Sequence, residues 1–293
     1  MKNKDGCAAA LGTFDGLHIG HKALLDTLKE NAGGRLSMVC TFSNIPASFF
    51  GADVKQLFTP EEKGDYISAE GIDVLFMRKF DKDFSVTSKD AFIKELLYEL
   101  GCRVIVVGYN YRFGRGGEGT AEYLSEEAAK AGVRVIIVPQ ITVDGEAVSS
   151  TKIREYITKG EIEAANKLLG HLYSVQGRVE GGARFGRTIG FPTANISVPE
   201  NKCLPKNGVY AVWAVVDGKR YRGMCNIGVR PTVDSSGRVS VETYIDDFNE
   251  DIYGKKLKLE FVKFIRPEVR MNGAEALKAQ LEQDLLSVRE ILK

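Results

Sequence analysis

The sequence is poor in the residues that mark several common classes of function. Its 293 residues include five cysteines, three histidines and one tryptophan. The cysteines are odd in number and far apart, which argues against both a disulfide framework and a zinc-binding knuckle. We therefore expect unpaired thiols that are mostly buried in apolar surroundings. With three histidines in all, a metal site built from imidazoles is also disfavoured.

Neither sign of charge is in excess. Forty Lys and Arg residues face 39 Asp and Glu residues, which gives a formal net charge of +1. So small a positive excess disfavours a dedicated nucleic-acid binder, which gains affinity by releasing counterions from a polyanion. No apolar run approaches the roughly 20 residues that a transmembrane helix needs, and no signal-peptide core follows the first residues. We expect a cytoplasmic protein with neither a nucleic-acid nor a membrane partner.

The length and the hydrophobic pattern predict two domains, with a boundary between residues 170 and 171. Domains commonly hold about 100 to 200 residues, and a content of 44% hydrophobic residues is ordinary for globular proteins. In residues 1–170, short apolar runs alternate with segments whose apolar residues recur at helical spacing, which predicts a doubly wound α/β domain. The predicted strands are 7–14, 35–42, 72–77, 103–107 and 133–138, and the predicted helices are 20–30, 60–69, 88–100 and 120–131.

Residues 171–293 have a different pattern. Strand-like segments at 210–216, 239–245 and 257–264 follow one another with Gly, Pro and Asp turns and no helix between them. This pattern predicts a small antiparallel β-barrel. Residues 273–292 return to helical spacing and predict a C-terminal helix that packs on the barrel. A charged helical stretch, 161–169, would join the two domains.

Two of the three histidines lie where the first strand should pass into the first helix. Residues 12–21 read Gly-Thr-Phe-Asp-Gly-Leu-His-Ile-Gly-His, so His18 and His21 are three residues apart. A helix N-terminus offers unpaired N–H groups to phosphate, Gly16 and Gly20 allow a polyphosphate to approach closely, and the imidazoles can donate hydrogen bonds to it. The alternative is a histidine pair whose hydrogen bonds are satisfied by the local backbone.

A second stretch with hydroxyls and cations follows the last strand predicted in this domain. Residues 149–154 read Ser-Ser-Thr-Lys-Ile-Arg. Alone, this stretch is a commonplace helix cap, but with the histidine loop it predicts one phosphate site served by two strand ends. Such a site suits nucleotidyl transfer by positioning, without a covalent intermediate. The residues predicted to bind ATP here are Gly12, Phe14, Asp15, Gly16, Gly20, Ser150, Thr151, Lys152 and Arg154.

These motifs resemble those of the HxGH nucleotidyltransferases, and more closely the adenylyltransferase half of the prokaryotic bifunctional riboflavin kinase/FMN adenylyltransferases (FAD synthetases). Residues 107–114, Val-Gly-Tyr-Asn-Tyr-Arg-Phe-Gly, are similar to a later signature of that family. Two departures occur: residues 43–46 read Ser-Asn-Ile-Pro in place of the usual Pro-His-Pro turn, and Asn110 replaces a common aspartate. The resemblance implies that His18 and His21 are catalytic.

A glycine- and arginine-rich stretch opens the second domain and ends in Phe-Pro-Thr-Ala-Asn at residues 191–195. Glycine amides can form an anion nest, and Thr193 and Asn195 offer the neutral oxygens that Mg²⁺ accepts beside ATP. A hairpin with solvated arginines is the alternative. The stretch is not a Walker A loop, because Arg187 replaces the lysine and Pro192 prevents the helix that must follow. The phosphate-binding candidates are Gly181, Gly182, Arg184, Gly186, Arg187 and Gly190.

This second stretch resembles that of riboflavin kinases, residue for residue at 192–195, and residues 226–232, 241–254 and 265–268 are similar to further segments of that family. The resemblance implies that Glu242 takes the proton from the ribityl hydroxyl of riboflavin. The strand pattern leaves open whether Glu242 points into or out of the barrel, and an ordinary strand glutamate would be solvated. The flavin contacts chosen for aromatic or polar character are Asn110, Arg112, Phe113, Tyr253 and Arg266.

Together the resemblances imply an Mg²⁺-dependent enzyme that phosphorylates riboflavin with ATP to FMN and then adenylylates FMN to FAD. Its ligands would be riboflavin, FMN, FAD and ATP. A kinase with a weakened adenylyltransferase domain stays open as an alternative, because residues 43–46 depart from the family. A non-catalytic flavin or nucleotide sensor also stays open, although a sensor has no need of a catalytic base. An RNA-binding barrel that uses its arginines is disfavoured by the near-neutral charge.

Overall fold

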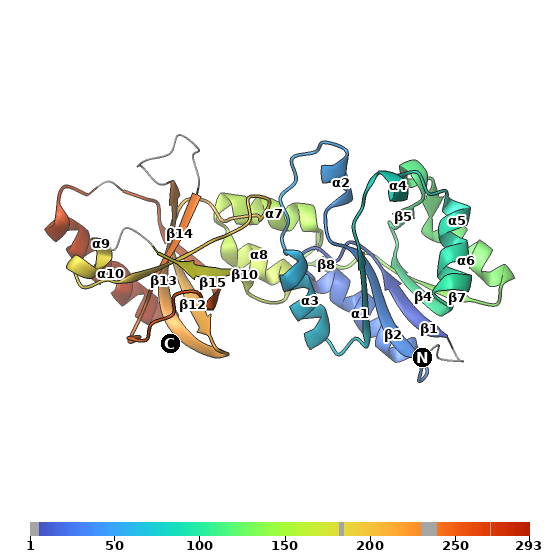
Figure 1. Ribbon diagram of the computed structural model, residues 1–293, viewed down its shortest axis with the longest axis horizontal. Helices are drawn as coiled ribbons and strands as arrows, with labels where there is room; N and C mark the ends of the chain where they lie inside the picture. Colours follow the sequence, from blue (N-terminus) through green and yellow to red (C-terminus); the bar gives the residue numbers. More distant parts are fainter. Residues whose placement is uncertain (1–5, 182–184, 230–238, 270) are drawn as a thin grey trace. The chain divides into compact units, whose positions relative to one another are not determined.

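The computed structural model describes residues 6–181, 185–229, 239–269 and 271–293. The chain divides into two compact units, Met1–Ser150 and Thr151–Lys293, which Figure 1 shows in sequence colours. The boundary predicted at residue 170 lies after two helices that this division groups with the second unit. Within the described ranges, no helix combines the length and the apolarity that a membrane span requires.

The first unit is built on a parallel five-stranded sheet, as predicted. Its strand order is β3-β2-β1-β4-β7, and every neighbouring pair runs parallel. The strands are β1 (Cys7–Leu11), β2 (Leu36–Phe42), β3 (Val74–Arg78), β4 (Cys102–Gly108) and β7 (Arg134–Val138). The winding reverses between β1 and β4, and in such sheets ligands bind beyond the carboxyl ends of the strands at this point.

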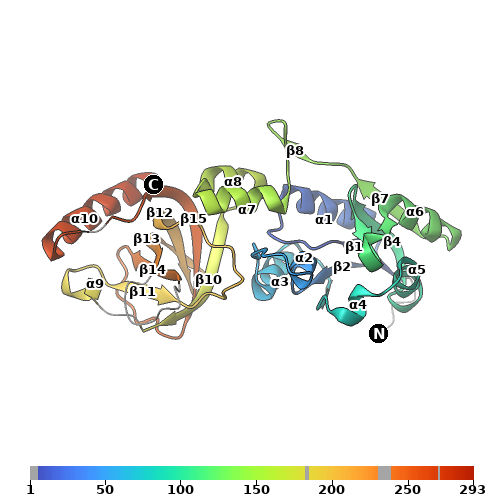
Figure 2. The same ribbon diagram turned by 90° about the horizontal axis from the view of Figure 1, so that it is seen from above.

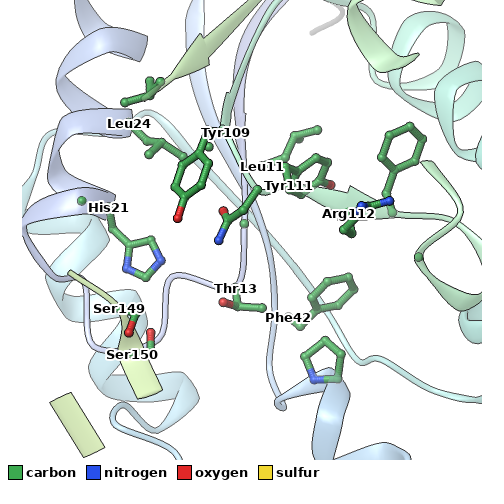
Figure 3. A pocket seen from close by; sticks show the side chains of 18 of the residues that line it. Leu11, Thr13, His21, Leu24, Phe42, Tyr109, Tyr111, Arg112, Ser149 and Ser150 are labelled. Atoms are coloured by element: carbon green, nitrogen blue, oxygen red, sulfur yellow. The ribbon is translucent and has the colours of Figure 1, made fainter. Parts of the chain in front are cut away.

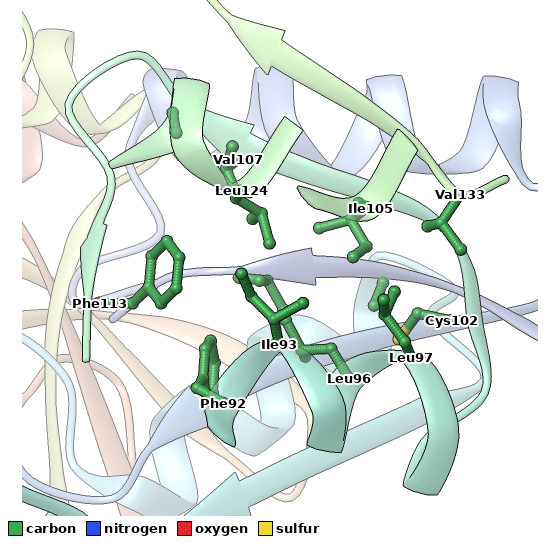
Figure 4. Packing of buried hydrophobic residues seen from close by; sticks show 14 of the residues in the cluster. Phe92, Ile93, Leu96, Leu97, Cys102, Ile105, Val107, Phe113, Leu124 and Val133 are labelled. Carbon is green, nitrogen blue, oxygen red and sulfur yellow. The ribbon is translucent and has the colours of Figure 1, made fainter. Parts of the chain in front are cut away.

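Helices cover both faces of this sheet (Figures 1 and 2). Along β1, Ala8 and Ala10 pack with α1 and α3 on one face, while Ala9 and Leu11 pack with α5, η1 and α6 on the other. Figure 4 shows the second cluster, in which Phe92, Ile93, Leu96 and Leu97 face Ile105, Val107 and Leu124. The small side chains of β1 let helices approach the middle of the sheet closely. These helices are α1 (Ile19–Asn31), α3 (Pro60–Ala69), α5 (Lys89–Lys94), η1 (Glu95–Glu99) and α6 (Ala121–Lys130).

Two predicted elements in this unit differ from the structure by more than two residues. The predicted helix 88–100 changes at Glu95 from α-helix to the π-helical segment η1. The predicted strand 7–14 ends at Leu11, and the chain beyond it is not extended: Phe14 has a φ of 46°. The short elements of the unit are α2 (Pro46–Phe49), α4 (Lys82–Ser85), β5 (Arg112–Phe113), η2 (Arg115–Gly117), β6 (Gly119–Thr120), β8 (Thr142–Val143) and β9 (Glu146–Ala147).

The second unit contains the predicted antiparallel barrel. It is closed, with the order β10-β11-β14-β13-β12-β15. Three of its strands, β12, β14 and β15, are the predicted ones, and β10, β11 and β13 were not predicted. The strands are β10 (Tyr173–Glu180), β11 (Thr193–Ile196), β12 (Gly208–Val216), β13 (Lys219–Val229), β14 (Val239–Ile245) and β15 (Lys256–Arg266).

The C-terminal helix α10 (Ala274–Ile291) packs along the outside of the barrel, against β12, β13 and β15. Its apolar stripe includes Leu281, Leu285 and Val288, and it meets Trp213 and Tyr244 of the barrel. This arrangement confirms the predicted C-terminal helix. The other helices of the unit are α7 (Ser150–Lys159), which begins at the division between the units, α8 (Ile162–Leu169) and α9 (Phe185–Thr188).

All five cysteines are unpaired thiols, as expected, and all but Cys40 are buried. Burial raises the pKa of Cys40 and of Cys225 to about 12. At neutral pH these two thiols therefore stay protonated and unreactive.

Candidate functional site

A cavity of about 710 Å³ lies beyond the carboxyl ends of β1, β4 and β7 in the first unit (Figure 3). Figure 3 shows His21 near Ser149 and Ser150, with Phe42, Tyr111 and Arg112 farther along. The sheet thus brings together segments more than 100 residues apart. The predicted site residues that line the cavity are Gly12, His18, Gly20, His21, Asn110, Arg112, Phe113 and Ser150.

The two histidines form a stacked pair at the start of α1. His18 is the N-cap, and its Nδ1 accepts a hydrogen bond from the backbone N–H of His21 at 3.2 Å. The ring centroids are 3.7 Å apart, with 16° between the ring planes. A Cβ at Gly20 would come within 3.2 Å of the His18 ring, so glycine leaves the room for this stack. Because Nδ1 accepts, a neutral His18 carries its proton on Nε2.

His21 is held in the neutral form. Burial lowers its pKa well below 6.5, and the nearby His18 and Lys63 lower it further. Its Nδ1 is buried and has no hydrogen-bond partner among the described residues. A buried acceptor without a partner is tolerated better than a buried N–H without one, so we assign the proton to Nε2. His21 can therefore donate one hydrogen bond to a ligand without carrying a charge.

The loop before the histidines is held by buried contacts. Phe14 is fully buried and its ring lies 5.1 Å from that of His21. The Asp15 carboxylate accepts hydrogen bonds from the backbone N–H groups of Leu57 and Phe58, at 3.0 and 2.9 Å. The prediction of a phosphate contact by Asp15 does not fit this geometry, because the carboxylate is buried, engaged and of the wrong charge. Asp15 instead fixes the loop, and Gly16 supplies a φ of 84° within it.

The Ser149–Arg154 stretch lies where α7 begins. The Ser150 hydroxyl donates to the carbonyl of Asp15 at 2.8 Å, which joins the start of α7 to the histidine loop. Thr151, Lys152 and Arg154 follow on the first turns of α7. Lys152 Nζ lies 3.7 Å from a carboxylate oxygen of Glu155.

Sequence reasoning missed a buried lysine that contacts the histidine loop at Thr13. Lys63 of α3 is 5% exposed, and its ammonium group donates to the backbone carbonyls of Thr13 and Phe42, each at 2.7 Å. The available signal was its position four residues before Ile67, on the buried stripe of the helix.

One end of the cavity is aromatic, which the sequence motifs did not indicate. Phe42, Phe50, Phe80 and Phe84 line it, and the Phe42 ring meets those of Phe80 and Phe84 edge-on at 5.4 and 5.2 Å. Phe113 is buried here and contacts Phe92. An apolar, aromatic pocket of this kind suits a flat ring system.

The departure at residues 43–46 takes part in this wall. The Asn44 amide donates to the carbonyl of Phe80 at 2.9 Å and accepts from the N–H of Phe80 at 2.8 Å. Pro46 begins α2 and lines the cavity. The Ser-Asn-Ile-Pro turn therefore has a defined structural task, which is to fix Phe80.

In the second unit, the candidate kinase residues meet on one face of the barrel. Asn195 of β11 pairs with Glu242 of β14, and Asn226 of β13 pairs with Glu242 from the other side. Along β14, Val241 and Thr243 are buried while Glu242 is partly exposed, so Glu242 points to the opposite face from these two. The pattern alone had left this orientation open. Tyr244, on the same face, packs with α10.

Thr193 pairs with Tyr244, so its hydroxyl lies on the same face as Asn195 and Glu242. The Thr193 hydroxyl and the Asn195 amide oxygen are hard oxygen donors, and this pair fits the neutral ligands that Mg²⁺ accepts. A cavity of about 420 Å³ lies against Thr193 and against Ala194, Thr243 and Ile245, which point to the opposite face, and neither Asn195 nor Glu242 lines it. Its lining includes Arg187, Pro192, Thr193, Phe248, Asp251 and Tyr253.

The described end of the glycine-rich stretch, residues 186–191, forms a tight turn after the start of α9. The N–H of Phe191 donates to the carbonyl of Gly186 at 2.8 Å, and a Cβ at Gly186 would overlap the carbonyl oxygen of Phe191. Gly190 has a φ of 86°, and Gly181 is exposed. The predicted phosphate contacts Gly182 and Arg184 lie outside the described residues.

Arg266, predicted as a flavin contact, is used elsewhere. Its guanidinium binds the carboxylate of Asp284 on α10, with Nε–Oδ1 and Nη2–Oδ2 distances of 2.9 and 2.7 Å. A further N–H donates to the carbonyl of Pro267 at 3.0 Å. The geometry thus assigns Arg266 to fastening α10, whereas Tyr253 lines the second cavity.

Comparison with known proteins gives a family for each unit. The FAD synthetase family model matches residues 1–152, and the riboflavin kinase model matches residues 169–292. A bifunctional riboflavin kinase/FMN adenylyltransferase of Listeria monocytogenes is 41% identical over 280 residues, which cover 94% of this chain and 89% of the relative. The protein of the same name from Escherichia coli is 35% identical over 293 residues, covering 98% and 93%.

A solved structure resembles the chain over nearly its whole length. It is described as a macrolide-efflux protein from Streptococcus pneumoniae, with a TM-score of 0.87 and 30% sequence identity. The match covers 98% of this chain and 95% of the other.

Proposed function

The chain belongs to the family of bifunctional riboflavin kinase/FMN adenylyltransferases, and from this premise we propose which of its residues carry each reaction. The enzyme phosphorylates riboflavin with ATP to FMN, and it adenylylates FMN with ATP to FAD and pyrophosphate. The riboflavin kinase half is C-terminal and the FAD synthetase half is N-terminal. Because both steps consume ATP, we propose that it works in the cytoplasm.

In the adenylyl transfer, a phosphate oxygen of FMN attacks the α-phosphorus of ATP, and the bond to the bridging oxygen of the β-phosphate breaks. Gly12, Gly20 and Ser150 border the space for the triphosphate. We propose Thr151, Lys152 and Arg154, which follow Ser150 along the chain, as further phosphate ligands. His18 and neutral His21 donate from Nε2 to oxygens on which negative charge grows. The convergence of the histidine loop and Ser150 on one cavity is the observation that carries this proposal.

The flavin ring of FMN has a matching place in the same cavity. The aromatic wall of Phe42, Phe80 and Phe84 would pack against the isoalloxazine ring. Asn110 and Arg112 are exposed on the lining and would contact polar groups of FMN. Phe113 would complete the apolar wall from its buried position.

In the phosphoryl transfer, the ribityl hydroxyl of riboflavin attacks the γ-phosphorus of ATP, and ADP leaves. Glu242 accepts the hydroxyl proton. Thr193 and Asn195 would hold Mg²⁺, which neutralises charge on the β- and γ-phosphate oxygens when bound. Arg187 and the glycine turn around α9 would hold the phosphates, and Tyr253 would contact the flavin. The row of Asn195 and Glu242 on one barrel face supports these assignments.

One variant in each unit tests the division of labour. We expect His21→Ala to abolish FAD formation and to leave FMN formation intact. We expect Glu242→Gln to slow FMN formation by about 10² or more, because a general base contributes that much, and to leave FAD formation from supplied FMN unchanged. Chromatographic separation of the flavins over time measures both rates. Equal loss of both reactions in His21→Ala, or a near-normal kinase rate in Glu242→Gln, would contradict the assignments.

A further inference from the structure

A buried ammonium group lies between the ends of β1 and β2, which border the adenylyltransferase cavity together with β4 and β7. Lys63 Nζ donates to the carbonyl of Thr13, just after β1, and to that of Phe42, the last residue of β2. It also lies 3.4 Å from the hydroxyl of Thr41, which itself donates to Thr13 at 2.9 Å. One side chain thus sets the spacing of two segments that line the cavity.

Lys63 is held in place by the helix that carries it. The helix α3 begins with a capping box, in which the Thr59 hydroxyl accepts from the N–H of Glu62 and the Glu62 carboxylate accepts from the N–H of Thr59. Such a cap fixes the first turn of the helix, where Lys63 lies. The neighbouring loop is tied down independently by Asp15, through the N–H groups of Leu57 and Phe58.

The charge of Lys63 acts on His21. Burial lowers the pKa of Lys63 to about 8, and the Asp15 carboxylate opposes this shift. Lys63 lies close enough to His21 to lower the pKa of that imidazole, together with burial and His18. The ionisable groups that face one another here are therefore Asp15, His18, His21 and Lys63.

We propose that Lys63 is a positioning residue for adenylyl transfer, which aligns the ends of β1 and β2 and places a positive charge beneath the ATP phosphates. It does not line the cavity, so it acts through Thr13, Phe42 and His21 rather than by contact with substrate. The inference rests on the proposed function of the histidine loop.

The pH dependence of FAD formation from FMN tests this role. We would measure kcat/KM for ATP between pH 6 and 10, since this quantity reports ionisations of the free enzyme. In the unmodified enzyme we expect kcat/KM to fall above about pH 8, as Lys63 loses its proton. Lys63→Met should lower kcat/KM about ten-fold or more at pH 7 and should lack this alkaline fall, because misplaced reacting groups commonly cost that much.

Two further variants separate charge from packing. Lys63→Arg keeps the charge and should recover most of the activity, with the alkaline fall moved above pH 10. Thr41→Val removes a neighbouring hydrogen bond but leaves the ammonium group, so its alkaline fall should stay near pH 8. If Lys63→Met fails to fold, as judged by circular dichroism, the pH profile of Lys63→Arg decides the question.

The outcomes distinguish this inference from the function on which it rests. If His21→Ala still makes FAD, the assignment of the histidine loop is wrong. If His21→Ala is inactive but folded Lys63→Met keeps both the rate and the alkaline fall of the unmodified enzyme, the role of Lys63 is refuted. An alkaline fall that Lys63→Arg leaves in place would refute it as well. Riboflavin phosphorylation by the same preparations should be unchanged in every Lys63 variant and serves as the control for enzyme concentration.

Discussion

At the scale of single residues, the neutral His21 links the active site to stability. Its pKa in the folded protein lies well below 6.5, whereas in the unfolded chain it should be near 6.5. Between these two values the unfolded chain binds more protons than the folded one. The contribution of neutral His21 to the free energy of unfolding is therefore complete above about pH 6.5. It is lost as the pH falls toward the pKa of His21 in the folded protein.

We therefore expect the first unit to become less stable below about pH 6.5, with a limiting slope of about 1.4 kcal/mol per pH unit from this group. Amide hydrogen exchange in β1 and β4, corrected for intrinsic rates, measures the free energy of opening. In His21→Gln the part of the slope due to this imidazole should vanish. Equal slopes in both proteins between pH 5 and 7 would show that His21 is not held neutral.

Single residues also show where sequence reasoning reached its limit. His18 and His21 were found because a motif places them at a helix start, which local sequence can reveal. Lys63 was not found, because only the folded neighbourhood brings its ammonium group to Thr13 and Phe42. Asp15 and Arg266 were chosen as ligand contacts, but their partners Leu57 and Asp284 come from segments whose proximity the sequence does not reveal.

At the scale of elements, α10 is fastened to the barrel by two ion pairs with buried carboxylates. Arg266 binds Asp284, which is 2% exposed, and Arg289 binds Asp246, which is 3% exposed. Arg289 lowers the pKa of Asp246, so this carboxylate stays ionised at neutral pH. Both pairs flank the apolar stripe of α10 that covers the barrel.

We expect Asp284→Ala to destabilise the second unit by about 3 kcal/mol, because it leaves the partly buried Arg266 without its counter-charge. Urea unfolding followed by fluorescence measures this loss. The single tryptophan, Trp213, lies in β12 beside α10 and therefore reports on this unit. Glu282→Gln, an exposed change on the same helix, is the matched control and should shift the free energy of unfolding by less than about 0.5 kcal/mol.

Among the strands, those with strong local patterns were predicted and those defined by their partners were not. β12 is almost entirely apolar, and β14 alternates apolar and polar residues; both patterns are typical of strands in a core. β13 begins Lys-Arg-Tyr-Arg, and β11 is four residues long within a stretch rich in Gly and Pro. These strands exist because closing the barrel gives their backbone groups partners on both sides, β14 and β12 for β13, and β10 and β14 for β11.

At the scale of the whole molecule, the sequence revealed the two architectures and the order of the two activities. The change from alternating helices and strands to strands alone marks the passage from a parallel sheet to a barrel. The family models match the two halves in the predicted order, FAD synthetase first and riboflavin kinase second. The Ser-Asn-Ile-Pro turn, in which the family's usual motif is replaced, holds Phe80 at the wall of the first cavity through Asn44.

Because each unit carries its own cavity, the two reactions should be separable between molecules. His21→Ala can make FMN but not FAD, and Glu242→Gln can make FAD when FMN is supplied. We expect an equimolar mixture of the two variants to convert riboflavin to FAD, after a lag in which FMN accumulates in solution. Either variant alone, at the same total concentration, should yield little FAD from riboflavin.

The length of that lag tests how FMN moves between the sites. If FMN passes through solvent, added FMN should remove the lag, and the final FAD rate of the mixture should reach about half that of the unmodified enzyme, since half the molecules have an intact adenylyltransferase site. A mixture that forms FMN but no FAD, while FAD forms readily in the unmodified enzyme, would show that FMN reaches the second site only within one molecule. Separation of the flavins at successive times, with the two variants mixed and apart, distinguishes these results.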